Sequence, residues 1–235
     1  AAIDDLQLGR VAIGIFMSDI GGLERLGDMA AVRRGKGSES EGGIRVPLIV
    51  HWPSKVASGQ VIDKPVHIID LYPTFMEIAG GDAGSHHLDG ASILSLMDGR
   101  GGFDRDAIYM HTPLYIPHYN KTPSSLIRTD DYKLIYFHGD YLHESDYKTV
   151  IPGERYELYR INEDISEQKN LADAMPEKTV ELKSKLHAWL EETGAQMPVI
   201  NPDFDLDGWQ FKTSSRLDHQ GNVIPQNASK GQKKK

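Results

Sequence analysis

Apolar positions form two nearly unbroken runs early in the chain. Val11–Met17 is apolar throughout, and Val46–His51 is a second, largely apolar run that stops before Pro53. A continuous apolar run, unlike an alternating one, is typical of a central parallel strand that is covered on both faces. We therefore predict two buried strands of a parallel sheet.

Helical spacing surrounds these strands. Ala1–Leu8 has the pattern of the end of an amphipathic helix, with Ile3, Leu6 and Leu8 on its inner face. Ile68–Ala79 predicts a helix that carries Pro73 in its first turns and stops at the glycine pair that follows it. A second, short helix is predicted within Leu88–Leu96.

The pattern changes near residue 105, where short apolar runs become separated by polar turns. Such runs predict an antiparallel sheet; they are Ala107–Met110, Ser125–Arg128, Lys133–Phe137 and Arg155–Arg160. Pro176–Glu192 then has the spacing of an amphipathic helix, which Gly194 closes. Its predicted inward residues are Val180, Leu182, Leu186, Trp189 and Leu190.

These elements predict an α/β fold with three regions. Residues 1–105 are expected to form part of an α/β layer, and residues 106–205 a subdomain made of the antiparallel sheet and one packing helix. Residues 206–235 have weak periodicity and are expected to wrap the surface or to be disordered.

Composition and charge exclude several classes of protein. The chain has 235 residues and no cysteine, which excludes disulfides, Cys-ligated metal sites and a Cys nucleophile. Its net charge of −8 argues against nucleic acid as a partner. The longest apolar run, Val11–Met17, is far shorter than the roughly 20 residues of a membrane helix, so we expect no membrane span.

Candidate chemistry is densest between residues 18 and 47. Asp19 follows the first predicted strand, at the end where open α/β sheets bind ligands, and a carboxylate there suits a hard divalent cation. Lys36 lies between two glycines, which lets its ammonium approach an anion beside exposed backbone N–H groups. Together these residues suggest a site for an anionic oxyester on a metal; the alternative is a surface loop in which Asp19 caps a helix.

The same residues resemble a known family. Phe16-Met-Ser-Asp-Ile-Gly-Gly22 resembles the F-T-S-D-N-G-G pattern of the type I sulfatases, and Gly35-Lys-Gly-Ser38 with Glu41-Gly-Gly-Ile-Arg-Val-Pro47 is similar to their G-G-K-G-S and E-G-G-I-R-V-P segments. The likeness extends to about Asp205, in the same order, through Trp52–Lys55, Ile69–Thr74, His111, Tyr115–Tyr119, Pro123–Arg128, Tyr132–Ile135, Glu157–Tyr159 and Asn170–Ala172.

The resemblance implies the carboxyl-terminal half of a sulfatase, with the sandwich fold of the alkaline-phosphatase-like superfamily. Such enzymes hydrolyse sulfate esters of small molecules or glycans with a formylglycine nucleophile, made from the first residue of a C/S-x-P-x-R motif. A calcium ion holds the sulfate. On this resemblance Asp19 would be a calcium ligand, Lys36 a catalytic residue that contacts the sulfate, and His111 and His118 substrate-binding residues. The family also implies a periplasmic or extracellular location, which the sequence itself leaves open.

The chain also departs from the family pattern. It contains no C/S-x-P-x-R motif, and the family's early metal-binding Asp pair is absent. Ile20 stands where the family has an Asn that ligates calcium, and its side chain has no oxygen to offer. Tyr115 replaces the first His of the family's H-Y-P-H-Y segment, unless an insertion lets His111 take that part. We therefore expect weak or no calcium binding and no hydrolysis by this chain alone.

Other candidates have simpler interpretations. Glu39 and Glu41 near Lys36 could form an acid/base pair, but solvated loop carboxylates are favoured. The adjacent His86 and His87 point apart and favour a polar loop over a metal pair. For the isolated histidines packing or surface roles are expected; these are His51, His67, His138 and His143.

Three hypotheses about function stay open at this stage. The first is a sulfatase whose working form is longer than this chain. The second is a non-catalytic remnant that binds a partner, through self-association or with an amino-terminal sulfatase half. The third keeps the fold but changes the ester, to a phosphate diester or a phosphonate monoester.

Overall fold

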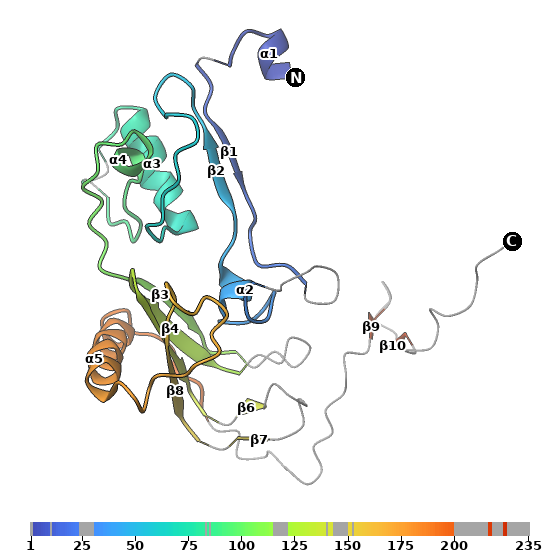
Figure 1. Cartoon of the computed structure of the whole chain (residues 1–235), viewed down its shortest axis with the longest axis vertical. Coiled ribbons are helices and arrows are strands. Elements are labelled where there is room, and N and C mark those ends of the chain that lie inside the picture. Colours follow the sequence, from blue (N-terminus) through green and yellow to red (C-terminus); the bar gives the residue numbers. More distant parts are fainter. Residues whose placement is uncertain are drawn as a thin grey trace, which may run out of the picture.

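The structure, a computed structural model, describes residues 2–9, 11–23, 31–82, 84, 86–114, 122–139, 141–142, 150–151, 153–199, 216–217 and 223–224. In Figure 1 they form an upper part built around a two-stranded ribbon and a lower part built around a four-stranded sheet. None of the helices found in these residues is long and apolar enough to cross a membrane.

The upper part contains the two predicted apolar strands. They are β1 (Gly14–Met17) and β2 (Leu48–His51), preceded by the short helix α1 (Ala2–Asp5). The two strands pair antiparallel, with Gly14 opposite His51 and Met17 opposite Leu48. The predicted parallel arrangement is thus wrong for this pair, because an unbroken apolar run does not by itself determine strand direction.

The ribbon has one uncovered face. Phe16 and Ile49 are cross-strand partners and remain 64% and 59% exposed. The predicted inner face of the first helix is exposed as well, with Ile3 at 48%, Leu6 at 68% and Leu8 at 44%. In Figure 1 the helices that follow the ribbon in the chain lie on one side of it, whereas α1 lies beyond its upper end.

These helices confirm the prediction for residues 68–79. A 3-10 turn, η1 (Ile68–Asp70), leads into α3 (Leu71–Ile78), whose third residue is the buried Pro73. The short helix predicted after it is α4 (Leu94–Met97).

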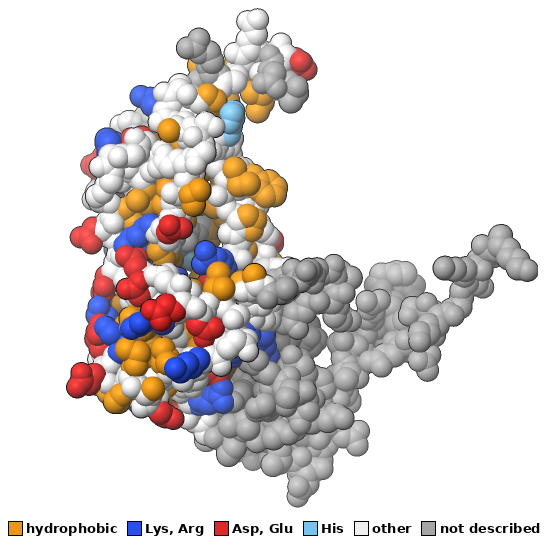
Figure 2. Space-filling view, in the orientation of Figure 1, with side chains coloured by type: hydrophobic (Ala, Val, Ile, Leu, Met, Phe, Trp, Pro, Cys, Tyr) orange, Lys and Arg blue, Asp and Glu red, His pale blue; other side chains and the backbone are white. Residues whose placement is uncertain are grey.

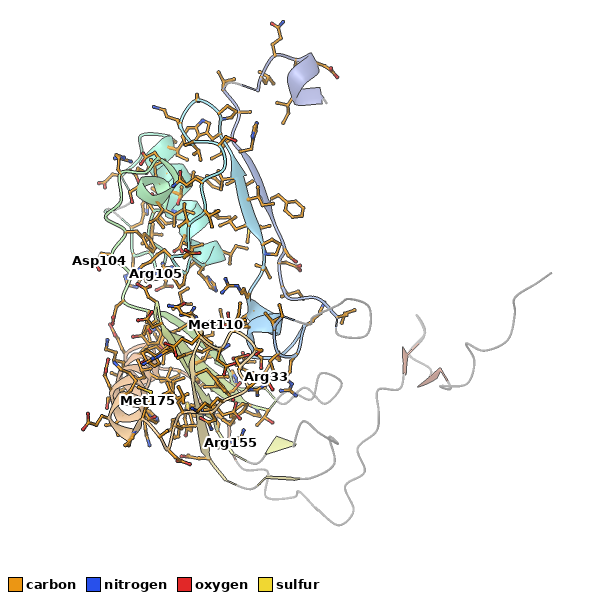
Figure 3. All side chains as sticks on the ribbon, viewed as in Figure 1. Arg33, Asp104, Arg105, Met110, Arg155 and Met175 are labelled. Atoms are coloured by element: carbon orange, nitrogen blue, oxygen red, sulfur yellow. The ribbon has the colours of Figure 1, made fainter. Side chains whose placement is uncertain are left out.

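Asp70 connects the segments before and after α3 through hydrogen bonds. Its carboxylate is fully buried and accepts hydrogen bonds from the backbone N–H groups of His67 and Ala91, at 2.7 and 3.0 Å. The same carboxylate accepts from Arg105, whose Nη1 lies 2.6 Å from Oδ2. Arg105 leads into the lower part (Figure 3), so this ion pair anchors the connection between the two parts.

The lower part is the predicted antiparallel sheet with its packing helix. The strand order is β3 (Ile108–Thr112), β4 (Ser124–Arg128), β5 (Tyr132–Phe137) and β8 (Arg155–Arg160), each pair antiparallel. Four further strands of two residues each form two separate antiparallel pairs: β6 (Tyr141–Leu142) with β7 (Val150–Ile151), and β9 (Arg216–Leu217) with β10 (Val223–Ile224). Beyond those last two strands, the predicted tail lies outside the described residues.

Helix α5 (Pro176–Glu192) covers one face of this sheet and matches its predicted bounds. Leu182, Leu186 and Leu190 are buried against Ile127, Leu134, Tyr136 and Leu158. Trp189 stacks on Tyr109 with ring centroids 5.1 Å apart. Val180, predicted inward, is 61% exposed, because it lies at the margin of the apolar stripe.

The opposite face of the sheet packs on the segment that carries the candidate chemistry. Leu126, Ile135, Phe137 and Tyr159 form a second buried cluster with Ile161, and Ile44 of the helical turn α2 (Glu41–Ile44) packs against it. The sheet thus separates α5 from the Lys36 loop. This layer order decides which candidate residues can meet.

Candidate active-site loops

The two segments with sulfatase-like sequence lie directly against each other. The backbone N–H of Gly21 donates to the carbonyl of Gly43 at 3.0 Å, and the N–H of Lys36 donates to the carbonyl of Gly22 at 2.8 Å. The Asp19 loop and the Lys36 loop are therefore joined through their backbones.

This close approach explains two of the glycines. A Cβ added at Gly21 would overlap the carbonyl oxygen of Gly42, and one added at Gly42 would overlap that of Arg34. The N–H of Gly42 also donates to the carbonyl of Arg33 at 3.0 Å. Only glycine allows backbone segments to come this near, so packing requires glycine at positions 21 and 42.

A buried lysine of the sheet, Lys133, contacts the segment that follows Lys36. Lys133 is fully buried, and its Nζ lies 2.9 Å from Oε1 of Glu41 and 2.5 Å from Oε1 of Glu167. It also donates to the backbone carbonyl of Glu39 at 3.0 Å. The second oxygen of Glu167 accepts from the N–H of Glu41 at 2.8 Å, which closes the network at the start of α2.

The charges of this network are set by burial and by Lys133 together. Burial alone would raise the pKa of Glu41, but the Lys133 ammonium, together with Arg128 and Arg45, more than offsets this and holds that pKa below its ordinary value. For Glu167 burial dominates and raises the pKa of its carboxyl. Lys133 and the two arginines thus keep a buried carboxylate charged beneath the candidate site.

A second ion pair fixes the start of the Lys36 loop. Arg33 Nη2 lies 3.2 Å from Oε2 of the buried Glu157, and its Nη1 donates to the hydroxyl of Tyr159 at 2.6 Å. Arg155 pairs with the same Glu157 carboxylate. Figure 3 shows Arg33 and Arg155 near each other at this end of the sheet.

The interpretation of Glu39 and Glu41 as solvated carboxylates is wrong. Their exposed fractions are 6% and 3%, and Glu39 accepts from the hydroxyl of Ser124. A small cavity of about 30 Å³ lies between this loop and the sheet, lined in part by Glu39, Ser124 and Ser125. Neither carboxylate is free to act as a general acid or base toward a substrate in solution.

Lys36 itself is half-buried and its backbone is fixed, but its ammonium is available. No carboxylate of the described ranges pairs with it, although acidic residues lie on both sides in the sequence. An unpaired ammonium among glycines can bind an oxyanion through charge and neighbouring N–H groups.

Asp19 is exposed, as is Ile20 beside it. Within the described part of the chain, no group of three or more His, Cys, Asp or Glu side chains could hold a metal ion. Calcium takes six to eight oxygen ligands, so Asp19 and its described neighbours do not by themselves fit a calcium ion.

His111 lies away from the Lys36 loop. Its strand partner is Ser125, and both belong to the face of the sheet that α5 covers, whereas the loop packs on the opposite face. Nδ1 of His111 is 2.7 Å from the Ser125 hydroxyl, and Nε2 is 3.0 Å from the carbonyl oxygen of Gln196. His118 lies outside the described residues.

The residues that support the loops were not singled out from the sequence. Lys133 shares an alternating pattern with Ile135 and Phe137, which would have placed it on an inward face. No local signal marks Glu167 as its partner, because the two residues meet only through the fold.

Comparisons with known proteins agree with this arrangement. The family model for the N-sulphoglucosamine sulphohydrolase C-terminal region matches residues 36–196. A sulfatase from Formosa agariphila is 32% identical over 197 residues, which cover 77% of this chain and 33% of that protein. The chain thus spans about a third of that relative's length.

Solved structures show the same fold. The crystal structure of Ps i-CgsB superposes with a TM-score of 0.65 at 26% identity, covering 80% of this chain and 38% of that one. BT4656, solved in complex with its substrate D-glucosamine-2-N,6-O-disulfate, superposes with a TM-score of 0.59 at 24% identity and covers 83% of this chain and 37% of that one. The chain therefore belongs to the type I sulfatase family and corresponds to its carboxyl-terminal half.

Proposed function

We propose that this chain supplies the Lys36 side of a sulfatase active site and that the nucleophile comes from a part of the enzyme outside these 235 residues. The observation that carries the proposal is the position of Lys36: its loop is fixed by buried ion pairs and glycine contacts, yet its ammonium has no carboxylate partner in the described ranges. Such a preorganised cation is suited to charge that develops on a sulfate ester oxygen.

Sulfated glycans are the substrate class that we favour. Ps i-CgsB, which is 26% identical to this chain, has been solved in complex with a neocarrahexaose. A sulfated sugar would present several anionic oxygens to Lys36. His111 and His118 remain predicted substrate-binding residues, and both ring nitrogens of His111 have hydrogen-bond partners within the chain.

A calcium ion at Asp19 would need further oxygen ligands. Asp19 would contribute one carboxylate, and the remaining oxygens would have to come from residues outside the described part of this chain. When bound, the ion would supply positive charge beside the sulfate. Ile20 adds no oxygen to such a site, so we expect this chain alone to bind calcium weakly or not at all.

The uncovered ribbon face is the proposed contact with the rest of the enzyme. Phe16 and Ile49 are large, exposed and directly paired, and hydrophobic side chains gather on that side of β1 and β2 in Figure 2. The match covers 33% of the Formosa agariphila protein, so about two thirds of that relative has no counterpart in this chain. We propose that the amino-terminal sulfatase half, or a second copy in its absence, covers this face.

Turnover of an aryl sulfate tests the proposed division of the site. The pure chain is expected to release no more sulfate than its Lys36→Ala variant, because no motif places a nucleophile in it. When the chain is produced together with an amino-terminal half that carries a C/S-x-P-x-R motif, turnover should appear and Lys36→Ala should lower it by about 10²–10³-fold.

Two outcomes of this experiment would contradict the proposal. One is Lys36-dependent hydrolysis by the chain alone. The other is a joined enzyme that prefers a phosphate diester or a phosphonate monoester over every sulfate ester offered, which would favour the alternative ester within the same fold.

A further inference from the structure

Three polar side chains on the α5 side of the sheet form a hydrogen-bonded row. The Ser125 hydroxyl lies 2.7 Å from Nδ1 of His111 and 2.8 Å from Nε2 of His138. The two imidazole rings are perpendicular, with centroids 5.5 Å apart. Ser125 is buried, so its oxygen has these two partners in place of water.

The contact between His111 and Gln196, at one end of the row, fixes the direction of each hydrogen bond. Nε2 of His111 faces the carbonyl oxygen of Gln196 at 3.0 Å, and a carbonyl only accepts. His111 must therefore carry a hydrogen on Nε2. A neutral imidazole has one N–H, which leaves Nδ1 as an acceptor for the Ser125 hydroxyl.

The same reasoning fixes His138. Because Ser125 donates its only hydrogen to His111, its oxygen accepts from Nε2–H of His138. Nδ1 of His138 is then a bare nitrogen, and it is buried without a hydrogen-bond partner among the described residues. Burial, with smaller effects of His111 and His187, lowers the pKa of His138 to about 4 against the opposing effects of a backbone contact with Ser124 and of Glu154, which agrees with a neutral ring.

The reverse direction is disfavoured. If His111 carried hydrogens on both nitrogens, Ser125 would donate to His138 instead. The single hydrogen of a neutral His138 would then sit on Nδ1, as a buried N–H without a partner. An orphaned N–H and an added half-buried charge both raise the free energy of that arrangement.

We propose that Ser125 and His138 are positioning residues that fix His111 in the tautomer protonated at Nε2. His111 therefore offers a hydrogen-bond donor, and not a lone pair, at its outer nitrogen. A sugar oxygen of a bound glycan could replace the Gln196 carbonyl as the acceptor there; this last step alone rests on the proposed function.

Imidazole ¹⁵N NMR of the whole chain near pH 7 tests the inference without any substrate. Both His111 and His138 are expected to show a protonated Nε2 and an unprotonated Nδ1. Ser125→Ala removes both hydrogen bonds and should move both rings toward a tautomeric mixture, whereas Ser125→Thr keeps a hydroxyl and should restore the pattern.

Ser124→Ala is the matched control, because Ser124 is the adjacent buried serine on the opposite face and bonds Glu39. It should leave both rings unchanged. Protonation of Nδ1 in either ring of the unmutated chain would overturn the inference, and so would rings that Ser125→Ala leaves unchanged. The tautomers of the unmutated chain decide the question even if Ser125→Ala does not fold, and an adverse result would leave the sulfatase proposal intact.

Discussion

Lys133 joins the sheet to the loop that carries Lys36. Its ammonium is fully buried and contacts two carboxylates and a carbonyl. Glu167, one of these partners, has a backbone φ of +52°, a left-handed conformation that disfavours a residue with a side chain. The strained placement of Glu167 is consistent with a fold that requires its carboxylate at this point.

Removing the Lys133 charge should destabilise the chain strongly. Lys133→Met leaves Glu41 and Glu167 buried without their cation, so the free energy of unfolding should fall by about 3–5 kcal/mol. Lys185→Met is the control, because Lys185 pairs at the surface with Asp106 and should change stability by at most about 1 kcal/mol. Urea unfolding of both variants measures the difference; equal losses would contradict the assigned role of Lys133.

His138 should make the chain less stable in mild acid. Burial lowers its pKa from 6.5 to about 4, with smaller lowering effects of His111 and His187 that a backbone contact with Ser124 and the charge of Glu154 oppose. Between these two pH values the unfolded chain binds a proton that the folded chain does not, so stability falls as the pH decreases from about 6.5 toward 4. Urea midpoints at pH 7 and pH 5 should therefore differ more for the unmutated chain than for His138→Gln. The same pH dependence in both proteins would show that His138 is not held neutral.

At the scale of elements, the strongly periodic segments could be predicted from the sequence. Pro176–Glu192 is a helix with those bounds, and Gly194 closes it at a φ of +60°, with the N–H of Ala195 bonded to the carbonyl of Leu190 at 2.9 Å. Arg155–Arg160 is a strand with its predicted bounds, and the other three strands of the lower sheet differ from prediction by one or two residues at their ends. Local pattern suffices for the helix because it has one buried face, and for the strands because polar turns separate their short apolar runs.

Features that depend on distant partners could not be predicted in this way. The direction of β1 relative to β2 follows from the chain path, which takes the Lys36 loop between them. The burial of Glu39 and Glu41 follows from Lys133 and Ser124, more than 80 residues away in sequence. The order of the Asp19 and Lys36 motifs did indicate the loops, but not the ion pairs that hold them.

Two alanine substitutions in α5 compare a residue of its buried apolar stripe with a residue at the margin of that stripe. Leu186 is fully buried against the sheet, so Leu186→Ala should lower the free energy of unfolding by about 2–5 kcal/mol. Val180 is 61% exposed, so Val180→Ala should change it by no more than about 0.5 kcal/mol. Thermal or urea unfolding compares them, and a large loss from Val180→Ala would mean that this residue packs inward as its spacing first suggested.

On the scale of the whole molecule, the two parts differ in how completely they are covered. The lower sheet has α5 on one face and the Lys36 loop on the other, whereas the β1–β2 ribbon has a bare apolar face. Each large aliphatic or aromatic side chain left in water forgoes roughly 1.5–3 kcal/mol of burial. A few such residues rival the net stability of a domain, which favours association.

Sedimentation velocity at micromolar concentration is the most direct test of the claim that this chain is one half of a larger sulfatase. We predict self-associated species for the chain alone and a defined complex when an amino-terminal half carrying the C/S-x-P-x-R motif is added. Phe16→Ser with Ile49→Ser should weaken both, since these side chains form the exposed pair on the ribbon. A monomer in both samples, with a sharp cooperative melt, would contradict the claim and show that the chain closes its own core.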